Sequence, residues 1–250
     1  MTKPEWRGTF VQRLVQYTLL FGAITPLKVL RATVPSFVPL LVSEFDFTQA
    51  QTAALLSGFF PGYMCSMVPG AAIAAKCGAK TVMTGAMAGS AAIFFLMPTV
   101  ARHYGAGALT GLLTILGVIQ GPLSAVNTQM RKEWVPTAEG FENERIWQLR
   151  SVSIAMQSTD LTAALVVPYL YARGSFSYAC RWLATATTAV CCVWQLFAKS
   201  SPYDLPGAPT LPSSDVSSPL AARQKAVEWG IFRVRATWAM FTCVMGINAM

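Results

Sequence analysis

Long apolar stretches, separated by short polar segments, make up most of the chain. Six of them reach the length of about twenty residues that an α-helix needs to cross the hydrocarbon core of a bilayer. The pattern therefore predicts an all-α, polytopic membrane protein. The predicted spans lie near residues 13–41, 51–75, 81–101, 106–129, 149–171 and 177–198.

A seventh apolar stretch begins near Ala236 and is still running at Met250. About fifteen helical residues rise only about 22 Å, which is less than the roughly 30 Å of a hydrocarbon core. We therefore expect residues 232–250 to be the truncated start of a seventh helix.

Residues 199–231 differ in composition from the apolar stretches. Most of this segment reads KSSPYDLPGAPTLPSSDVSSPLAARQK, which is rich in Pro and Ser and has no apolar periodicity. Such a composition predicts a flexible linker. The predicted organisation is a six-helix unit over 1–198, a linker over 199–231 and the start of helix 7 over 232–250.

Composition supports the membrane class. The chain is 54% hydrophobic and only 12% charged, whereas soluble domains carry about a quarter charged residues. The formal net charge of +8 would suit a nucleic-acid partner, but the basic residues lie at the ends of apolar stretches and do not interleave with aromatic residues. The predicted partner is the lipid bilayer, and no nucleic-acid partner is expected.

The distribution of Lys and Arg predicts the orientation. If the N-terminus is cytoplasmic, fourteen basic residues lie on the cytoplasmic side and three on the other, which is a strong positive-inside bias. The cytoplasmic set is Lys3, Arg7, Arg13, Lys76, Lys80, Arg131, Lys132, Arg145, Arg150, Lys199, Arg223, Lys225, Arg233 and Arg235, and the opposite set is Arg102, Arg173 and Arg181. The identity of the membrane is left open by this pattern.

Residues typical of enzymes and metal sites are missing from the sequence pattern. His103 is the only histidine, and none of the six cysteines forms a CxxC pair. We find no nucleophile–base arrangement and no phosphate-cradling loop. The sequence therefore predicts neither an enzyme, nor a metal site, nor a cofactor.

One apolar stretch is crowded with small residues: GFFPGYMCSMVPGAAIAAKCGAK, from Gly58 to Lys80. Helices in lipid associate through close packing, which small residues permit. We expect Gly58, Gly62, Gly70 and the run Ala71–Ala75 to form a close-packing surface.

The same stretch ends in a basic turn, Lys76-Cys77-Gly78-Ala79-Lys80. Gly78 can adopt the left-handed conformation that a tight turn requires, and the two lysines suit the cytoplasmic side. A generic hairpin between two membrane helices would have the same features.

This segment resembles the helix 2–3 region of major facilitator superfamily transporters, and within them the anion/cation symporter family of sialin and the vesicular glutamate, type I phosphate and plastid phosphate carriers. The matching residues are Phe59-Phe60, Gly62-Tyr63, Pro69-Gly70, Ala74, Gly78 and Lys80. Further matches follow in the family's order at Arg31, Trp134–Pro136, Glu144-Arg145, Pro168, Lys199–Pro202, Trp229, Trp238-Ala239 and Asn248.

The resemblance implies the N-terminal half of a twelve-helix transporter that works by alternating access around a site between two halves. Its implied partners are the C-terminal half of the same transporter and a small anion, with co-transported H⁺ or Na⁺ as an option. Three positions depart from the family pattern. Leu113 replaces an arginine, Gln120 replaces a glutamate, and Ala75 replaces an acidic residue.

Two cations lie inside the first predicted span. A charge near mid-bilayer is costly and is a functional candidate by default. Lys28 and Arg31 are three residues apart and share one helical face, so together they can clamp a carboxylate or phosphate. Arg31 also sits where the resembling family carries a helix 1 arginine. The alternative is that either residue snorkels to the interface or forms a structural pair.

Asp160 is the acidic residue placed well inside a span. It suits a proton site, a counter-ion to Lys28 or Arg31, or a polar interhelical contact. We predict the counter-ion role, because two cations in one helix need compensation. Tyr63 and Gln120 are candidate hydrogen-bonding residues of the binding site, and ordinary interhelical packing is their alternative role.

These features together predict a secondary active transporter of an organic or inorganic anion, such as phosphate, glutamate or a similar carboxylate. A carrier for a neutral or cationic solute is the first alternative, because Leu113 and Gln120 remove family charges. A non-transporting membrane subunit is the second, because the seventh stretch is short.

Overall fold

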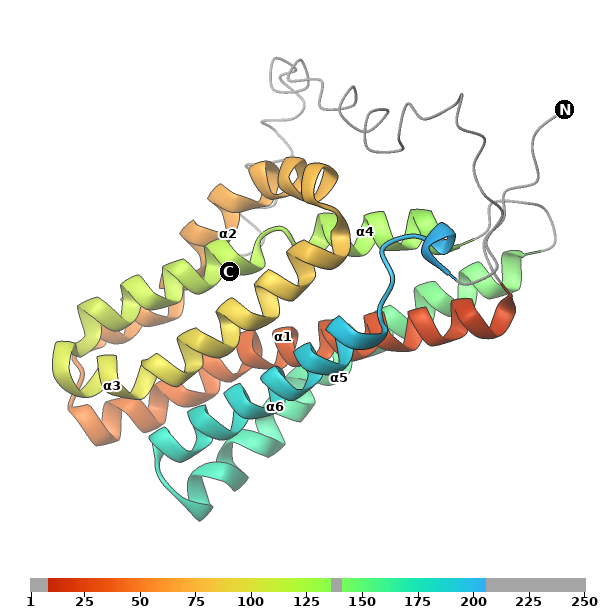
Figure 1. Cartoon of the computed structure of the whole chain (residues 1–250). Coiled ribbons are helices and arrows are strands. Elements are labelled where there is room, and N and C mark those ends of the chain that lie inside the picture. Colours follow the sequence, from red (N-terminus) through yellow and green to blue (C-terminus); the bar gives the residue numbers. More distant parts are fainter. Residues whose placement is uncertain (1–8, 136–140, 206–250) are drawn as a thin grey trace, which may run out of the picture. The chain divides into compact units, whose positions relative to one another are not determined.

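The computed structural model describes residues 9–135 and 141–205, and within them the chain is helical (Figure 1). A short 3₁₀ turn, Pro202–Asp204, follows the last helix. The rest of the predicted linker and the start of helix 7 lie outside the described residues. The helices are α1 (Phe10–Phe45), α2 (Gln49–Cys77), α3 (Ala79–Gln120), α4 (Leu123–Trp134), α5 (Glu142–Arg173) and α6 (Phe176–Phe197).

The first two helices begin at matching capping boxes. The Thr9 hydroxyl accepts a hydrogen bond from the Gln12 backbone at 3.4 Å, and the Gln12 side chain accepts one from the Thr9 backbone at 2.8 Å. Thr48 and Gln51 repeat the arrangement at 3.3 and 2.9 Å. Each box satisfies backbone donors that a helix start leaves free, so these short polar sequences set where α1 and α2 begin.

Helix α3 contains two of the predicted spans. Gly105 interrupts it with φ 71° and ψ −167°, a conformation that favours glycine, and the chain turns back at this point (Figure 1). The first arm, 79–104, corresponds to the span predicted at 81–101. The second arm, 106–120, continues through Gly121 and Pro122 into α4, and together they cover the span predicted at 106–129. The six predicted spans therefore correspond to helices of the structure.

The glycines of α2 form the predicted close-packing surface against the second arm of α3 and Pro122. In the run Ala71–Ala75, Ala74 is buried, but Ala71 and Ile73 are exposed, so the prediction was wrong for that part of the surface. A Cβ atom added to Gly62 would overlap the carbonyl oxygen of Thr114, and one added to Gly117 would overlap the carbonyl oxygen of Phe59. The two backbones are thus in direct contact. The Thr114 hydroxyl donates a 2.7 Å hydrogen bond across this contact to the carbonyl oxygen of Gly58.

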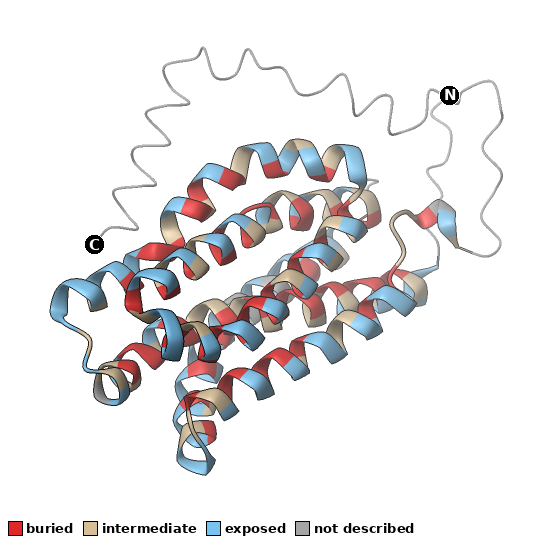
Figure 2. Ribbon diagram, turned by 60° about the vertical axis from the view of Figure 1, so that its left-hand side comes forward, coloured by how far each residue is buried: buried red, intermediate tan, exposed pale blue. Residues whose placement is uncertain are grey.

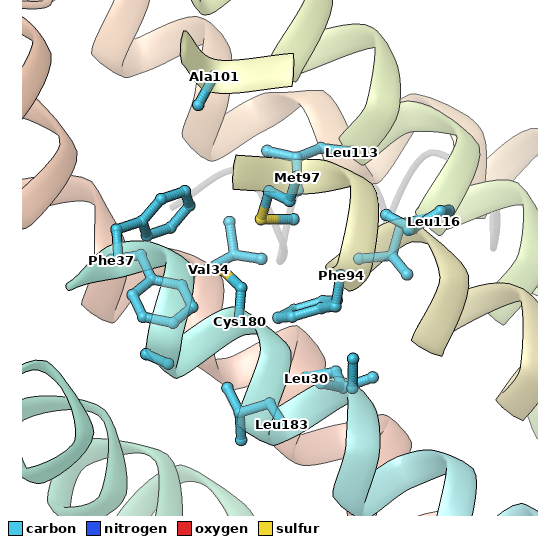
Figure 3. Close-up of a cluster of buried hydrophobic side chains, with 14 of the residues drawn as sticks. Leu30, Val34, Phe37, Phe94, Met97, Ala101, Leu113, Leu116, Cys180 and Leu183 are labelled. Carbon is cyan, nitrogen blue, oxygen red and sulfur yellow. The ribbon is translucent and has the colours of Figure 1, made fainter. Parts of the chain in front are cut away.

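Apolar side chains fill the interior in two clusters along α1. One surrounds Phe37 and includes side chains from α2, α3, α5 and α6, part of which is shown in Figure 3. The other surrounds Tyr17 and includes side chains from α2, α3, α4 and α6. Figure 2 shows the buried positions on the sides of helices that face one another. Because α1 contributes to both clusters, its polar residues are held in fixed positions relative to the neighbouring helices.

Candidate functional site

Arg31 lies on α1 against three aromatic rings of α2. Its guanidinium carbon is 4.9 Å from the ring centroid of Phe59, 5.7 Å from that of Phe60 and 5.1 Å from that of Tyr63. Such distances allow cation–π attraction, which contributes about 0.5–2 kcal/mol per pair depending on exposure. The electron-rich ring faces therefore stabilise the arginine charge within the bundle.

The spacing of the aromatic residues explains how α2 builds this surface. Phe59 and Tyr63 are four residues apart, so they lie one turn apart on the same face, and their rings stack at 5.6 Å with 26° between planes. Phe60 meets Phe59 edge to face at 6.0 Å. We call Phe59, Phe60 and Tyr63 the aromatic surface of α2.

The described part of the chain supplies no hydrogen-bonding partner for the Arg31 guanidinium. Within residues 9–135 and 141–205, Arg31 makes no hydrogen bond or ion pair, and its side chain is half-buried. A guanidinium has five N–H donors in a planar fork that matches a carboxylate or phosphate. The geometry thus places the guanidinium carbon over aromatic rings and leaves donors for a ligand.

Lys28 and Asp160 are near this position. Half-buried Lys28 lies one turn before Arg31, and the charges of both Arg31 and Asp160 act on it. Asp160 comes from α5, which packs against α1, and its side chain is exposed. No ion pair joins Asp160 to either cation among the described residues. The structure therefore brings together Lys28, Arg31 and Tyr63 and places Asp160 within electrostatic range of Lys28.

Gln120 is placed in an interhelical contact. It is 2% exposed, and its Nε2 atom donates a 3.2 Å hydrogen bond to the Ser90 hydroxyl, which joins the two arms of α3. This is the packing alternative for Gln120, so we leave it out of the proposed binding site. Sequence reasoning had no signal for Ser90, because the two residues are 30 positions apart and meet only when α3 folds back.

Leu113 occupies an apolar environment. It is 3% exposed and belongs to the buried cluster shown in Figure 3. Together with Val34, Phe37 and Leu109 it lines a small apolar pocket. No carboxylate lines this pocket. A leucine therefore fits here, and a lone cation would be buried without a partner.

The basic turn between α2 and α3 has the positive φ that was predicted. Gly78 adopts φ 84° with ψ 147°, so its backbone is in an extended region open to glycine and not in the left-handed helical region. The expected positive φ is present, but the left-handed helical conformation expected for the turn is not. Lys76 is exposed, whereas the Lys80 ammonium donates a 3.0 Å hydrogen bond to the carbonyl oxygen of Gln195 in the last turn of α6. Lys80 thereby satisfies a carbonyl at a helix C-terminus, where positive charge is favourable.

A buried ion pair that sequence reasoning missed joins the starts of α1 and α5. Arg13 Nε lies 2.8 Å from Glu144 Oε1, and Arg13 Nη2 lies 3.0 Å from Glu144 Oε2, with both side chains less than a tenth exposed. The Tyr17 hydroxyl lies 3.0 Å from Glu144 Oε1 and 3.1 Å from the carbonyl oxygen of Trp134 at the end of α4. In the sequence, Glu144 was noted only within the Glu144-Arg145 match to the resembling family. Its partner Arg13 was not predicted, because the two residues are 131 positions apart.

Burial by itself raises the pKa of the Glu144 carboxyl, but the hydrogen bonds from Arg13 and Tyr17 and the charge of Arg13 outweigh this effect and hold the pKa below its ordinary value. A lowered folded-state pKa means that the carboxylate stabilises the fold above the unfolded pKa of about 4.3. This contribution is lost as pH falls through the lower, folded-state pKa.

Glu144→Gln is expected to destabilise the protein by about 3 kcal/mol at neutral pH, because it breaks a buried, bidentate ion pair with Arg13 by removing one of the two charges. Thermal unfolding in detergent measures this, with Glu142→Gln, an exposed acidic residue of the same turn, as the control. The loss should shrink as the pH falls below the unfolded pKa of about 4.3 and through the lower folded-state pKa of Glu144, because the wild-type carboxylate is then protonated as well. Equal stability of the two variants at neutral pH would contradict this role.

Helices with outward apolar side chains around a charged and aromatic site define a membrane protein of the polytopic class. Large exposed apolar residues include Leu161, Leu165, Leu196 and Phe197, each more than 60% exposed. By length and composition alone, one helical stretch of the described chain, Ala79–Trp134, is apolar enough to cross a membrane. In α1, the charges of Lys28 and Arg31 lower the mean hydropathy.

The chain belongs to the Major Facilitator Superfamily, whose family model matches residues 20–250. The superfamily consists of multi-pass membrane proteins, so the predicted all-α polytopic fold is confirmed. The family and the names of the relatives point to a transporter.

Curated relatives support the narrower resemblance. A "Putative inorganic phosphate cotransporter" of Drosophila ananassae is 30% identical over 96 residues, which is 38% of this chain and 20% of the relative. "Sialin" of Ovis aries is 32% identical over 85 residues, 34% of this chain and 17% of the relative. "Sodium-dependent phosphate transport protein 1, chloroplastic" of Arabidopsis thaliana is 22% identical over 241 residues, 95% of this chain and 46% of the relative. The chain spans less than half the length of these relatives, and their names agree with the anion/cation symporter family.

Proposed function

We propose that the chain is the N-terminal half of a secondary active transporter that moves an organic or inorganic anion by alternating access. The observation that carries this proposal is the state of Arg31. Its guanidinium carbon lies over the rings of the aromatic surface of α2, and its N–H donors have no partner among the described residues. An anion reaching Arg31 would meet a pre-positioned, unpaired guanidinium.

The solute class follows from the same donors. A planar fork suits a carboxylate or a phosphate, and two of the relatives are named as phosphate transport proteins. Lys28 adds a second positive charge one turn away, and Tyr63 adds a hydroxyl next to the arginine. Asp160 serves as a counter-ion that offsets the charge of Lys28 when no anion is bound.

A carrier for a neutral or cationic solute is the second candidate. Leu113 favours it, because an apolar side chain lies in the core at a position where the resembling family has a cation. The same residue also suits an anion carrier with a single arginine, so the two candidates differ in the solute and not in the fold.

Uptake by proteoliposomes that contain the full-length polypeptide tests the proposal. We expect saturable uptake of at least one of phosphate, glutamate and ascorbate, and none of sugars or amines. The 1–250 chain alone should show no saturable uptake, because the site needs both halves. Uptake of an amine or a sugar without any anion would support the second candidate instead.

The same assay decides the role of Asp160. Gln120 has an amide, which does not titrate, so proton coupling through that position is not available. As a counter-ion, Asp160→Asn should weaken anion uptake at every pH. A well-folded Asp160→Asn protein that loses only the pH dependence of accumulation would identify Asp160 as a proton carrier.

We also propose that the N-terminus and the linker are cytoplasmic, in line with the positive-inside rule. A cysteine introduced by Ser214→Cys, in protein whose native cysteines are replaced, should react with an impermeant reagent from the cytoplasmic side only. Tyr104→Cys, at a position that is 72% exposed, is the matched control and should react only from the opposite side. The reverse labelling pattern would overturn the orientation.

A further inference from the structure

A second group of polar side chains includes a hydrogen bond from α4 to α5, near the end of the bundle that carries Glu144. Asn127 and Arg131 are four residues apart on α4 and therefore share one face of that helix. The Arg131 Nε atom donates a 3.1 Å hydrogen bond to Oε1 of Gln148 on α5. This bond joins the two helices and uses one of the five N–H donors of the guanidinium.

The group has more donors than acceptors. Gln148 is 1% exposed, and its Nε2 atom has no hydrogen-bond partner. Arg131 is half-buried, and no carboxylate forms an ion pair with it in the part of the chain that the structure describes. A buried amide nitrogen without an acceptor and a partly buried cation without a counter-ion are both unfavourable. One anion can satisfy both.

The unsatisfied side-chain oxygen of Asn127 limits which anions fit the site. Its side chain is 7% exposed, and Oδ1 lacks a donor. The guanidinium and the Gln148 amide nitrogen only donate, so they select oxygen atoms that carry negative charge. An oxyanion that also has an O–H group supplies the donor that Asn127 Oδ1 lacks.

We propose that Asn127, Arg131 and Gln148 form an anion site between α4 and α5 that takes a small protonated oxyanion, the class to which hydrogen phosphate belongs. The site uses none of the residues around Arg31 and does not depend on the transport role proposed for them. It explains why a neutral glutamine and not a carboxylate faces Arg131, since a carboxylate would neutralise the guanidinium and repel the ligand.

Equilibrium dialysis of the purified protein in detergent against radiolabelled inorganic phosphate, at neutral pH, tests the site. Arg131→Gln is expected to weaken phosphate binding about tenfold or more, because charge-assisted hydrogen bonds are lost. Gln148→Leu should also weaken it, by about threefold to tenfold. The control is Arg145→Gln, which removes an exposed cation from the same end of the bundle and should bind like the wild type.

A parallel series in an Arg31→Ala background separates the two sites, because any phosphate still bound there should disappear when Arg131→Gln is added. Thermal unfolding checks that each variant is folded. If the Arg131→Gln protein does not fold, phosphate binding by the Gln148→Leu protein decides whether the site exists. Wild-type phosphate binding by a folded Arg131→Gln or Gln148→Leu protein would overturn the site.

Sulfate has the same charge as hydrogen phosphate but no O–H group, so it should bind more weakly. Equal binding of sulfate and phosphate would overturn the role of Asn127.

Discussion

Arg31→Ala is expected to lower the affinity of the full-length transporter for its anion about a hundredfold, and Arg31→Lys about tenfold. The alanine variant loses charge and donors together, and two charge-assisted hydrogen bonds account for a loss of this size. A lysine keeps the charge but loses the planar fork and the stacking on the ring faces. Binding of the transported anion to purified protein measures both effects.

A matched control for this prediction exists elsewhere in the chain. Arg173 stacks on the Tyr169 ring at 4.6 Å, at the exposed end of α5. Arg173→Ala therefore removes a similar cation–π pair outside the proposed site and should leave anion affinity unchanged. Wild-type affinity in a folded Arg31→Ala protein would rule out the arginine as the anion ligand.

The aromatic surface can be tested in the same experiment. Tyr63→Phe keeps the ring face at 5.1 Å from the guanidinium, whereas Tyr63→Leu removes it. If stacking positions Arg31, the leucine variant should bind the anion more weakly than the phenylalanine variant. If the two bind equally and both bind weakly, the Tyr63 hydroxyl contacts the anion directly and the ring is not the important part.

Gly62→Ala is expected to cause the largest loss of stability, about 3 kcal/mol or more. The added methyl group would overlap the carbonyl oxygen of Thr114, which belongs to the backbone of α3 and cannot rotate away as a side chain could. The two helices must separate, and the 2.7 Å hydrogen bond from Thr114 to Gly58 is lost with their contact. Thermal unfolding and the yield of monodisperse protein in detergent measure the effect.

Gly85→Ala is the control, because nothing lies within 4 Å of a Cβ atom at this position of α3. Alanine has the higher helix propensity, so this variant should be as stable as the wild type or more stable by up to about 1 kcal/mol. A similar change in both variants would show that helix propensity and not close packing determines the result.

Part of the site was predictable because it depends on local properties of the sequence. Arg31 was identified from its position inside an apolar stretch, where a charge is energetically costly and is therefore a candidate for a functional role. Gly62 and Gly117 show the limit of such reasoning. The glycines of α2 indicated a close contact, but the sequence did not indicate that the partner is the second arm of α3, which begins after the chain reverses at Gly105.

The groups that stabilise the charge of Arg31 were not predictable in the same way. Two cations in α1 suggested compensation by Asp160, yet Arg31 is stacked on aromatic rings of α2 and forms no ion pair among the described residues. An aromatic ring offers partial negative charge on its face without being titratable, so it leaves no signal in a search for charged partners. Glu144 was missed as a buried ion-pair partner for a related reason, since an acidic residue in a first helical turn usually faces solvent.

The sequence by itself determined the helical class, the six stretches of apolar residues and the glycine turn at Gly78. These features follow from the length of apolar runs and from the freedom of one glycine, both of which are local. Only the tertiary structure decided which side chains meet: the rings around Arg31, the bond from Gln120 to Ser90, and the pairing of Arg13 with Glu144 over 131 residues. The physical reason is that these contacts depend on how helices remote in sequence pack and turn, and many packings share one hydrophobic pattern.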